Sequence, residues 1–350
     1  MDDSGAFQAW AAAAIAKRWP HARLDTIAAL RGDLSTRRFW RVAIASPQNQ
    51  APATAILVDL GPDGLPRYVR VLNLLPTPIT EPPWINVHRF LESIGSPVPE
   101  LYDADPARRA MLVEDVGVAS LLDAVRRPGA DPADLFRLAA SELIRIHVDG
   151  TAQIDARCIV HEIFYSGRLF EWELKEFAEV GLAAVAPGAE YSSIASELAT
   201  LAARLDRFPR VLSHRDYHRE NLYIQDGQRI RIIDFQDALM APAAQDLAVL
   251  LTTRDTDEVI TPAIERRILD FYCAGIARRG APALDAAEFM LSYRLCVLQH
   301  ALKMIGRFEN FERNGKTGYR QYIPHALGQA RRMLAETRAD FPKLSAALMP

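Results

Sequence analysis

The chain has 350 residues and an ordinary globular composition. It carries 41 lysines and arginines against 44 aspartates and glutamates, a formal net charge of −3, and 49% of its residues are hydrophobic. This much apolar material is enough for one or two hydrophobic cores, which excludes a disordered chain. The balanced charge gives no basic field, so neither nucleic acid nor an anionic membrane is an expected partner.

The basic residues are nearly all arginines. Only 5 of the 41 are lysines, and none lies between Lys17 and Lys175. No apolar run approaches the roughly 20 residues that a membrane-spanning helix requires. The three cysteines are far apart in the sequence and show neither a disulfide pattern nor metal-ligand spacing. We therefore expect a protein of the reducing cytoplasm.

The first third of the chain has the pattern of a small antiparallel sheet. Alternating apolar segments separated by turn residues predict about five strands, with two helical stretches after the third strand. The predicted strands are 24–30, 37–45, 53–60, 98–102 and 110–114, and the predicted helices are 65–75 and 84–94.

Beyond residue 117 the pattern is helical, with one clear β segment at 222–233. The predicted helices are 131–147, 164–180, 194–207, 262–279, 285–305 and 319–338. The whole pattern predicts an α+β chain with two lobes. A small antiparallel β-rich lobe is expected over residues 1–116 and a larger helical lobe over 117–350, with a hinge at about 111–120.

The β segment at 222–233 brings oxygen-bearing side chains together. Asp226-Gly227 is a strong tight-turn signal between two apolar runs, so the chain is expected to fold back there as a hairpin. Symmetric pairing across that turn places Asn221 next to Asp234, with Asp216 in the loop just ahead. Such a set of side chains is suited to a hard cation such as Mg²⁺ on nucleotide phosphates.

The spacing of these residues matches the catalytic arrangement of kinases. His214, Asp216 and Asn221 stand in the order H-x-D-x-x-x-x-N, and Asp234 follows after a short hairpin. Two departures point away from protein kinases: His218 follows Asp216 in the loop, and Phe235-Gln236 follows Asp234 in place of Phe-Gly.

The segment resembles the aminoglycoside phosphotransferase and choline kinase superfamily. Within it, the likeness is greatest to amino-sugar kinases of the AmgK type, which phosphorylate the anomeric hydroxyl of N-acetylmuramate and N-acetylglucosamine in peptidoglycan recycling. The similar segments are 32–42, 113–117, 233–239 and 245–247. The resemblance implies a protein-kinase-like fold and an ATP- and Mg²⁺-dependent phosphotransferase whose partner is a small-molecule sugar.

The resemblance also implies a role for each matched residue. Asp216 would be the catalytic base, and Asn221 and Asp234 would hold Mg²⁺. A turn over residues 32–38 would cover the nucleotide. The remaining candidates are Ser35 and Thr36 in that turn, Val113 and Glu114 at the adenine, His214 and Asp246 as supports of the loop, and His218 and Asp237 toward the acceptor.

The phosphate-binding lysine that is usual in this superfamily has no counterpart here. The matching strand, 53–59, contains no lysine. We expect Arg38, with Arg37 as the second candidate, to supply the charge, because a guanidinium clamps phosphate oxygens with two parallel bonds. The two arginines point to opposite faces of their strand, so only one of them can face the nucleotide.

Two other functions are compatible with the sequence. The chain could be a kinase of another hydroxylated metabolite, such as an aminoglycoside, a choline-like alcohol or an amino alcohol. A different class is a nucleotide-binding pseudokinase with a regulatory role, which the missing strand lysine favours and the intact Asp216, Asn221 and Asp234 set opposes. The sequence does not predict the oligomeric state.

Overall fold

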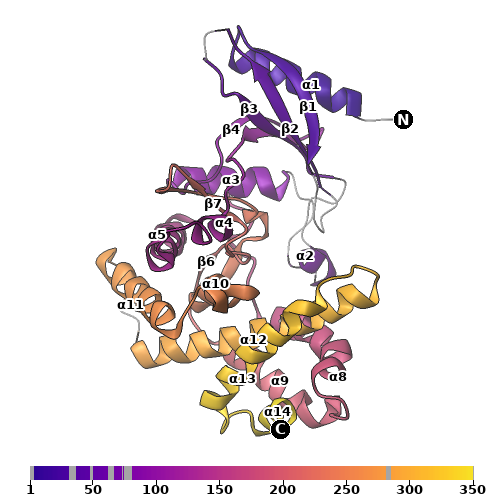
Figure 1. Cartoon of the computed structure of the whole chain (residues 1–350), viewed down its shortest axis with the longest axis vertical. Helices are drawn as coiled ribbons and strands as arrows, with labels where there is room; N and C mark the ends of the chain where they lie inside the picture. Colours follow the sequence, from indigo (N-terminus) through magenta and orange to yellow (C-terminus); the bar gives the residue numbers. More distant parts are fainter. Residues whose placement is uncertain are drawn as a thin grey trace. The chain divides into compact units, whose positions relative to one another are not determined.

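The computed structural model describes residues 4–30, 37–47, 50–61, 67–72, 74, 81–280 and 285–349. The chain forms two compact units, and Figure 1 labels many of their elements. The first unit comprises residues 1–119 and 223–236, and the second comprises 120–222 and 237–350. The hairpin that follows the loop of Asp216 therefore groups with the first unit. Within the described ranges, no helix combines the length and the apolar character needed to cross a membrane.

The first unit contains a five-stranded antiparallel sheet in the order β1-β2-β3-β5-β4. Its strands are β1 (Arg23–Leu30), β2 (Arg38–Ala45), β3 (Thr54–Asp59), β4 (Leu101–Asp105) and β5 (Ala110–Glu114). The strand predicted at 98–102 begins later, at Leu101, because the preceding backbone is bonded elsewhere. Pro99 O lies 2.6 Å from His88 Nε2, and Pro97 O accepts a bond from Ile232 N.

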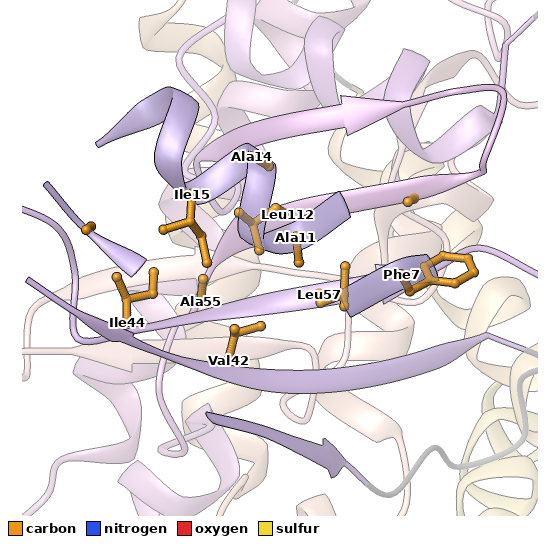
Figure 2. Packing of buried hydrophobic residues seen from close by; sticks show 11 residues of the cluster. Phe7, Ala11, Ala14, Ile15, Val42, Ile44, Ala55, Leu57 and Leu112 are labelled. Atoms are coloured by element: carbon orange, nitrogen blue, oxygen red, sulfur yellow. The ribbon is translucent and has the colours of Figure 1, made fainter. Parts of the chain in front are cut away.

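Among its described residues, the first unit has the helices α1 (Ser4–Arg18), α2 (Arg67–Leu72) and α3 (Pro83–Ser93). Helix α1 was not predicted, because its alanine-rich sequence carries only a weak apolar stripe. That stripe nevertheless packs on the sheet, as Figure 2 shows for Phe7, Ala11 and Ile15 near Val42 and Leu57. This contact forms a hydrophobic core of the unit, with α1 on the face of the sheet that carries Val42 and Leu57.

The alternation of β2 separates its side chains into two sets. Val42 lies in the core with α1, and the ring of Trp40 stacks on that of Phe7 with centroids 6.2 Å apart. Phe39 lies on the opposite face, where its ring meets Trp84 of α3 edge-on at 6.4 Å. Since the side chains of a strand point alternately to its two faces, Arg38 belongs with Trp40 and the α1 face.

The hairpin of the first unit is formed by β7 (Leu222–Gln225) and β8 (Arg229–Ile232). The predicted turn is present: Asp226 and Gly227 both have left-handed backbones, with φ of 51° and 73°. Consecutive positive φ values are what a tight hairpin turn requires, and Asp-Gly accepts them with little strain.

The second unit is helical. Its helices are α4 (Leu121–Val125), α5 (Pro132–Arg145), α6 (Thr151–Gln153), α7 (Gly167–Glu176), α8 (Leu182–Val185), α9 (Tyr191–Asp206), α10 (Ala244–Thr252), α11 (Pro262–Arg278), α12 (Ala286–Arg313), α13 (Ile323–Thr337) and α14 (Pro342–Leu348). Two π-helical segments, η1 (Ile146–Gly150) and η2 (Phe177–Gly181), continue α5 and α7. Short 3-10 turns of the second unit are η4 (Asp255–Glu258) and η5 (Arg320–Tyr322), and another, η3 (Phe235–Asp237), begins in the first unit and ends in the second.

Helix starts in the second unit follow the capping residues of the sequence. Asp131 accepts a bond from Ala133 N at 2.8 Å before α5, and Asp285 accepts one from Glu288 N at 2.7 Å before α12. Both carboxylates satisfy backbone N–H groups that lack a helical partner. One pair of strands was not predicted, β6 (Arg210–Ser213) with β9 (Leu239–Pro242), because four-residue apolar strands give too short a pattern.

The backbone of α12 packs against the backbone of α7 and η2 at Gly306. A Cβ added to Gly306 would overlap Phe177 N and lie 2.5 Å from Glu176 C. We therefore expect Gly306→Ala to lower the free energy of unfolding by about 2–3 kcal/mol, because a backbone cannot yield as a flexible side chain does. Urea denaturation measures this change. Gly328→Ala is the matched control on α13, where no atom lies within 4 Å of the added Cβ and the exposed helix should gain about 0.5–1 kcal/mol. Equal stability of the two variants would contradict the expected clash.

Candidate active site

The loop that contains Asp216 is anchored by a buried carboxylate on α10. Asp246 accepts bonds from the backbone N–H groups of His214 and Arg215, each at 2.8 Å. Arg215 has a left-handed backbone, with φ of 75°, which is uncommon for a residue with a side chain. The two bonds from Asp246 hold the backbone in this conformation and so fix the position of the next residue, Asp216.

Asp246 is itself held in place by a second layer of polar groups. His147 Nε2 lies 3.0 Å from Asp246 Oδ2, and His147 Nδ1 lies 2.7 Å from the hydroxyl of Tyr272. Burial opposes ionisation of Asp246, but the contacts with His147 and with His214 together outweigh it and keep the pKa of this carboxyl below its usual range. The loop therefore rests on an ionised and fully bonded carboxylate.

Asp216 and Asn221 lie together in the second unit. The Asn221 amide donates from Nδ2 to the carbonyl oxygen of Asp216 at 3.0 Å, and the same nitrogen lies 3.2 Å from His218 Nε2. Burial opposes ionisation of the Asp216 side chain, but the charges of Arg215 and Lys303 hold the pKa of its carboxyl below its usual range. The loop thus presents a carboxylate with an amide beside it.

A buried charge cluster behind this loop was not predicted from the sequence. Its centre is Glu173 of α7, which is fully buried. The Glu173 carboxylate accepts bonds from Arg215 at 2.8 Å and Gln299 at 3.0 Å, lies 3.3 Å from Lys303 Nζ, and also bonds the Tyr165 hydroxyl. Burial disfavours the Glu173 anion, but the charges of Lys303, Arg215 and Arg307 and the bond from Tyr165 together outweigh burial and lower its pKa well below the usual range.

One signal in the sequence could have revealed this cluster. Glu173 stands on the face of α7 that also carries Phe170, Leu174 and Phe177, all of them buried. An acidic residue within an apolar helical face is rare unless a cation is buried beside it. Lys303 shows the same anomaly on α12, and it is one of only 5 lysines in the chain.

In the first unit, Asp234 follows β8 on a strained backbone. Its φ of 63° is left-handed, and the Gln236 side chain donates to Asp234 Oδ1 at 3.1 Å. The next residue, Phe235, is buried and stacks on Trp84 of α3, with ring centroids 5.8 Å apart. This aromatic contact anchors the turn that carries Asp234. Trp84 therefore serves as packing within the first unit.

The two candidate arginines lie in different surroundings. A guanidinium nitrogen of Arg37 is 3.1 Å from Asp234 Oδ1, and the two side chains are 18% and 35% exposed. Arg38 instead bonds Asp59 Oδ2 at 2.7–2.8 Å, and its guanidinium lies over the Trp40 ring at 5.4 Å. Arg37 is thus the arginine that lies beside the candidate metal-binding carboxylate.

The candidate turn over residues 32–38 is only partly described. Ser35 and Thr36, together with the rest of 31–36, lie outside the described residues. Of the candidate turn over residues 32–38, the structure describes Arg37 and Arg38.

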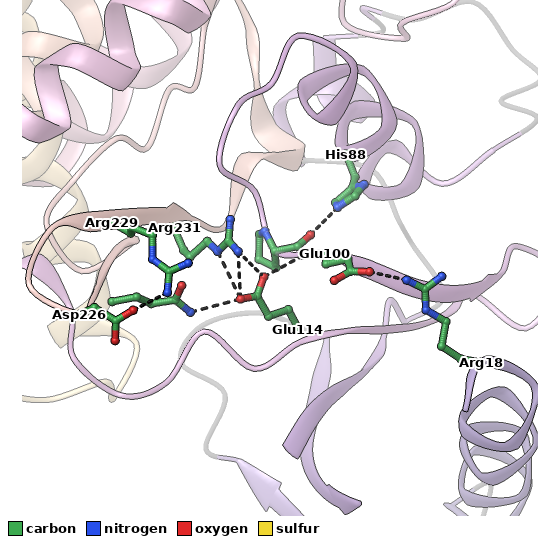
Figure 3. A network of polar contacts seen from close by, with 9 residues as sticks. Arg18, His88, Glu100, Glu114, Asp226, Arg229 and Arg231 are labelled. Atoms are coloured by element: carbon green, nitrogen blue, oxygen red, sulfur yellow. Dashed lines mark hydrogen bonds and ion pairs between the residues drawn. The ribbon is translucent and has the colours of Figure 1, made fainter. Parts of the chain in front are cut away.

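The candidate adenine residues, Val113 and Glu114, lie in β5. Glu114 donates its N–H to Glu100 O at 2.8 Å, so this donor is used within the sheet. Its carboxylate lies 3.1 Å from a guanidinium nitrogen of Arg231 and accepts a bond from Gln225 Nε2 at 3.2 Å (Figure 3). Glu114 thereby ties β5 to the β7–β8 hairpin within the first unit.

The two candidate acceptor residues flank the loop of the second unit. His218 Nδ1 lies 3.6 Å from Glu220, and Asp237 lies 3.9 Å from Arg215. The structure thus brings Asp216, Asn221, His218, His214 and Asp246 together in the second unit, and Arg37 with Asp234 in the first.

Comparison with known proteins agrees with this arrangement. Residues 26–284 match the model of the phosphotransferase enzyme family, APH. An N-acetylmuramate/N-acetylglucosamine kinase of Caulobacter vibrioides is 31% identical over 258 residues, which cover 67% of this chain and 65% of that protein, slightly less than two thirds of its length.

Solved structures show the same fold at low identity. A choline kinase of Streptococcus pneumoniae has a TM-score of 0.57 at 15% identity and covers 97% of this chain and 99% of its own. An aminoglycoside phosphotransferase in its ADP-bound form has a TM-score of 0.53 at 14% identity, covering 96% and 95%. These neighbours confirm the predicted α+β, protein-kinase-like fold class. Since the family model spans most of the sequence, the chain belongs to the phosphotransferase enzyme family.

Proposed function

We propose that this protein is an ATP- and Mg²⁺-dependent kinase that phosphorylates the anomeric hydroxyl of N-acetylmuramate or N-acetylglucosamine. The observation that carries the proposal is the anchored loop of Asp216, with Asn221 bonded to it at 3.0 Å. The choice of sugar is supported by the 31% identity to a curated kinase of these two sugars. As in the amino-sugar kinases that the sequence resembles, we place the reaction in the cytoplasm and in peptidoglycan recycling.

Asp216 is proposed to orient the sugar hydroxyl and to accept its proton. The lowered pKa of this carboxyl keeps it ionised near neutral pH, which a proton acceptor requires. Phosphoryl transfer has a largely dissociative transition state, so alignment of the attacking oxygen contributes more than strong basicity. The backbone N–H groups of the loop donate to Asp246, and these bonds fix this alignment before the sugar binds.

Asn221 and Asp234 fit the chemistry of a magnesium site. Both supply hard oxygen donors, which Mg²⁺ prefers, and Asn221 uses its nitrogen for the bond to Asp216. When bound, Mg²⁺ neutralises the charge of the β- and γ-phosphates. We assign nucleotide binding to the first unit, with adenine on the backbone that follows β5, and acceptor binding to the second unit, with His218 and Asp237 near the sugar.

Arg37, and not Arg38, is proposed to take the place of the missing lysine. We expect Arg37→Ala to raise the KM for ATP by about 10-fold or more, because it removes a charge-assisted contact to phosphate. Arg38→Ala is the matched control, since Arg38 is bonded to Asp59 on the α1 face, and its KM for ATP should remain near that of the wild type. Steady-state kinetics at saturating sugar measures both. A raised KM in Arg38→Ala alone would reverse the assignment.

The charges around Asp216 do not decide between the acceptors, because the cations Arg215 and Lys303 are balanced by the anions Glu173 and Asp216. We rank an aminoglycoside below an amino sugar because the curated relative that is 31% identical is named as a kinase of two amino sugars.

The proposal is tested by measuring ADP formation with a panel of acceptors. The panel contains N-acetylmuramate, N-acetylglucosamine, choline, ethanolamine and kanamycin, each with ATP and Mg²⁺. We expect turnover with the two sugars and its loss when EDTA removes the metal. Turnover with choline or kanamycin alone would overturn the choice of substrate, and ATP binding without turnover on any acceptor would support a pseudokinase instead.

A further inference from the structure

Helices α7 and α12 of the second unit are joined by two successive ion pairs. Glu173 lies 3.3 Å from Lys303, and three to four residues further along both helices Glu176 lies 3.6 Å from Arg307. The first pair is buried, with side chains 0% and 5% exposed, whereas the second is 24% and 32% exposed. The row of charges thus runs from the buried cluster behind Asp216 toward solvent.

Arg307 is held less tightly than two other cations of the second unit, Arg215 and Arg254. Arg215 bonds Glu173 at 2.8 Å, and Arg254 bonds both carboxylate oxygens of Glu220 at 2.7 and 2.8 Å. The single ion pair of Arg307 spans 3.6 Å, beyond the distance of a good hydrogen bond. A loose, partly exposed ion pair of this kind contributes little to stability. Arg307 can therefore exchange Glu176 for a ligand at small cost.

The backbone that carries Arg307 is fixed. Its neighbour Gly306 is where α12 meets η2, and Gly181 of η2 packs on the Gly306 backbone. The side chain of Arg307 therefore extends from a fixed point of α12, beside Glu176. Its charge also acts on the buried cluster, because Arg307 is among the groups that lower the pKa values of Glu173 and Lys303. A fixed backbone and a guanidinium with a weak ion pair suit the binding of an anion.

The two sugars of the proposed function differ in one charged group. N-acetylmuramate carries a lactyl carboxylate on the oxygen at C3, and N-acetylglucosamine has a hydroxyl there. We propose that Arg307 binds the carboxylate of an anionic acceptor and so gives the enzyme a preference for N-acetylmuramate over N-acetylglucosamine. This inference rests on the proposed function. A guanidinium recognises a carboxylate through two parallel bonds, which neutral sugars cannot form.

The inference is tested by the ratio of kcat/KM values for the two sugars. We expect Arg307→Ala to lower kcat/KM for N-acetylmuramate by about 10- to 100-fold, mainly through KM, and to leave that for N-acetylglucosamine within about twofold. Arg307→Lys keeps the charge but not the paired geometry, so it should recover part of the loss.

Glu176→Gln should have the opposite effect. It removes the carboxylate that competes for Arg307 and repels the ligand, so the KM for N-acetylmuramate should fall while that for N-acetylglucosamine stays unchanged. If the ion pair only joined the two helices, Arg307→Ala and Glu176→Gln would instead affect both sugars alike. Opposite effects on one sugar therefore distinguish binding from structural support.

Arg294→Ala is the matched control. Arg294 lies on the same helix, is also 32% exposed and also pairs with a carboxylate, Glu336 of α13, so neither sugar should be affected. An unchanged ratio in Arg307→Ala, with both sugars still turned over, would overturn this inference and leave the proposed function intact. Absence of turnover with either sugar in the wild type would overturn the proposed function itself.

Discussion

An Asp216→Asn variant is expected to lose about 10²- to 10⁴-fold in kcat, the usual contribution of a positioned proton acceptor. The amide keeps the size of the side chain but cannot accept the proton of the sugar hydroxyl. Binding of ATP should change little, because the proposed nucleotide contacts come from other residues, among them Arg37 and Asp234. Steady-state turnover and calorimetric titration with ATP and Mg²⁺ measure the two effects separately.

Asp237→Asn is the control for this substitution. Asp237 lies 3.9 Å from Arg215, the residue that precedes Asp216, and we propose it as a contact of the sugar, so its loss should affect KM for the sugar more than kcat. If the kcat of Asp216→Asn stayed near that of the wild type, the proposed role of Asp216 as proton acceptor would be contradicted. Loss of ATP binding in the same variant would show that Asp216 supports the fold of the site instead.

Replacing Glu173 is expected to cause the largest loss of stability. In Glu173→Leu the charges of Arg215 and Lys303 stay buried without their shared carboxylate, which costs about 3–5 kcal/mol of the free energy of unfolding. Activity should fall with it, because Arg215 immediately precedes Asp216. Urea denaturation followed by circular dichroism measures the stability.

Two further variants isolate the charge effect. The double variant Glu173→Leu with Lys303→Met removes one of the two uncompensated cations, so it should be less destabilised than the sum of the single changes. Glu171→Gln, an exposed position on the same helix, should stay within about 0.5 kcal/mol of the wild type. Additive losses in the double variant would contradict a shared charge cluster.

Local sequence patterns were sufficient for most of the fold. The strands of the first unit and the long helices of the second carry strong periodicity, and the Asp226-Gly227 turn is encoded by two adjacent residues that accept positive φ. The family resemblance also implied that Asp246 supports the loop, and the His214 and Arg215 N–H groups donate to its carboxylate. Helix α1 was missed because alanine supplies bulk to the core without a marked apolar stripe.

The rest depends on contacts between distant segments. Glu173 and Lys303 are 130 residues apart, and only the packing of α7 on α12 brings their charges together. Alternation along β2 showed that Arg37 and Arg38 face opposite ways, but not which face α1 covers. That face is decided by packing against α1, which the sequence pattern did not indicate.

Phosphorus NMR of the reaction product tests the proposed activity most directly. The protein is incubated with ATP, Mg²⁺ and N-acetylmuramate or N-acetylglucosamine, and the new phosphate signal is assigned by its coupling to sugar protons. We expect one phosphomonoester coupled to the anomeric proton, which is absent with Asp216→Asn. A phosphate coupled to the C6 protons would contradict the account. The absence of any sugar phosphate with folded protein and saturating ATP would contradict it as well.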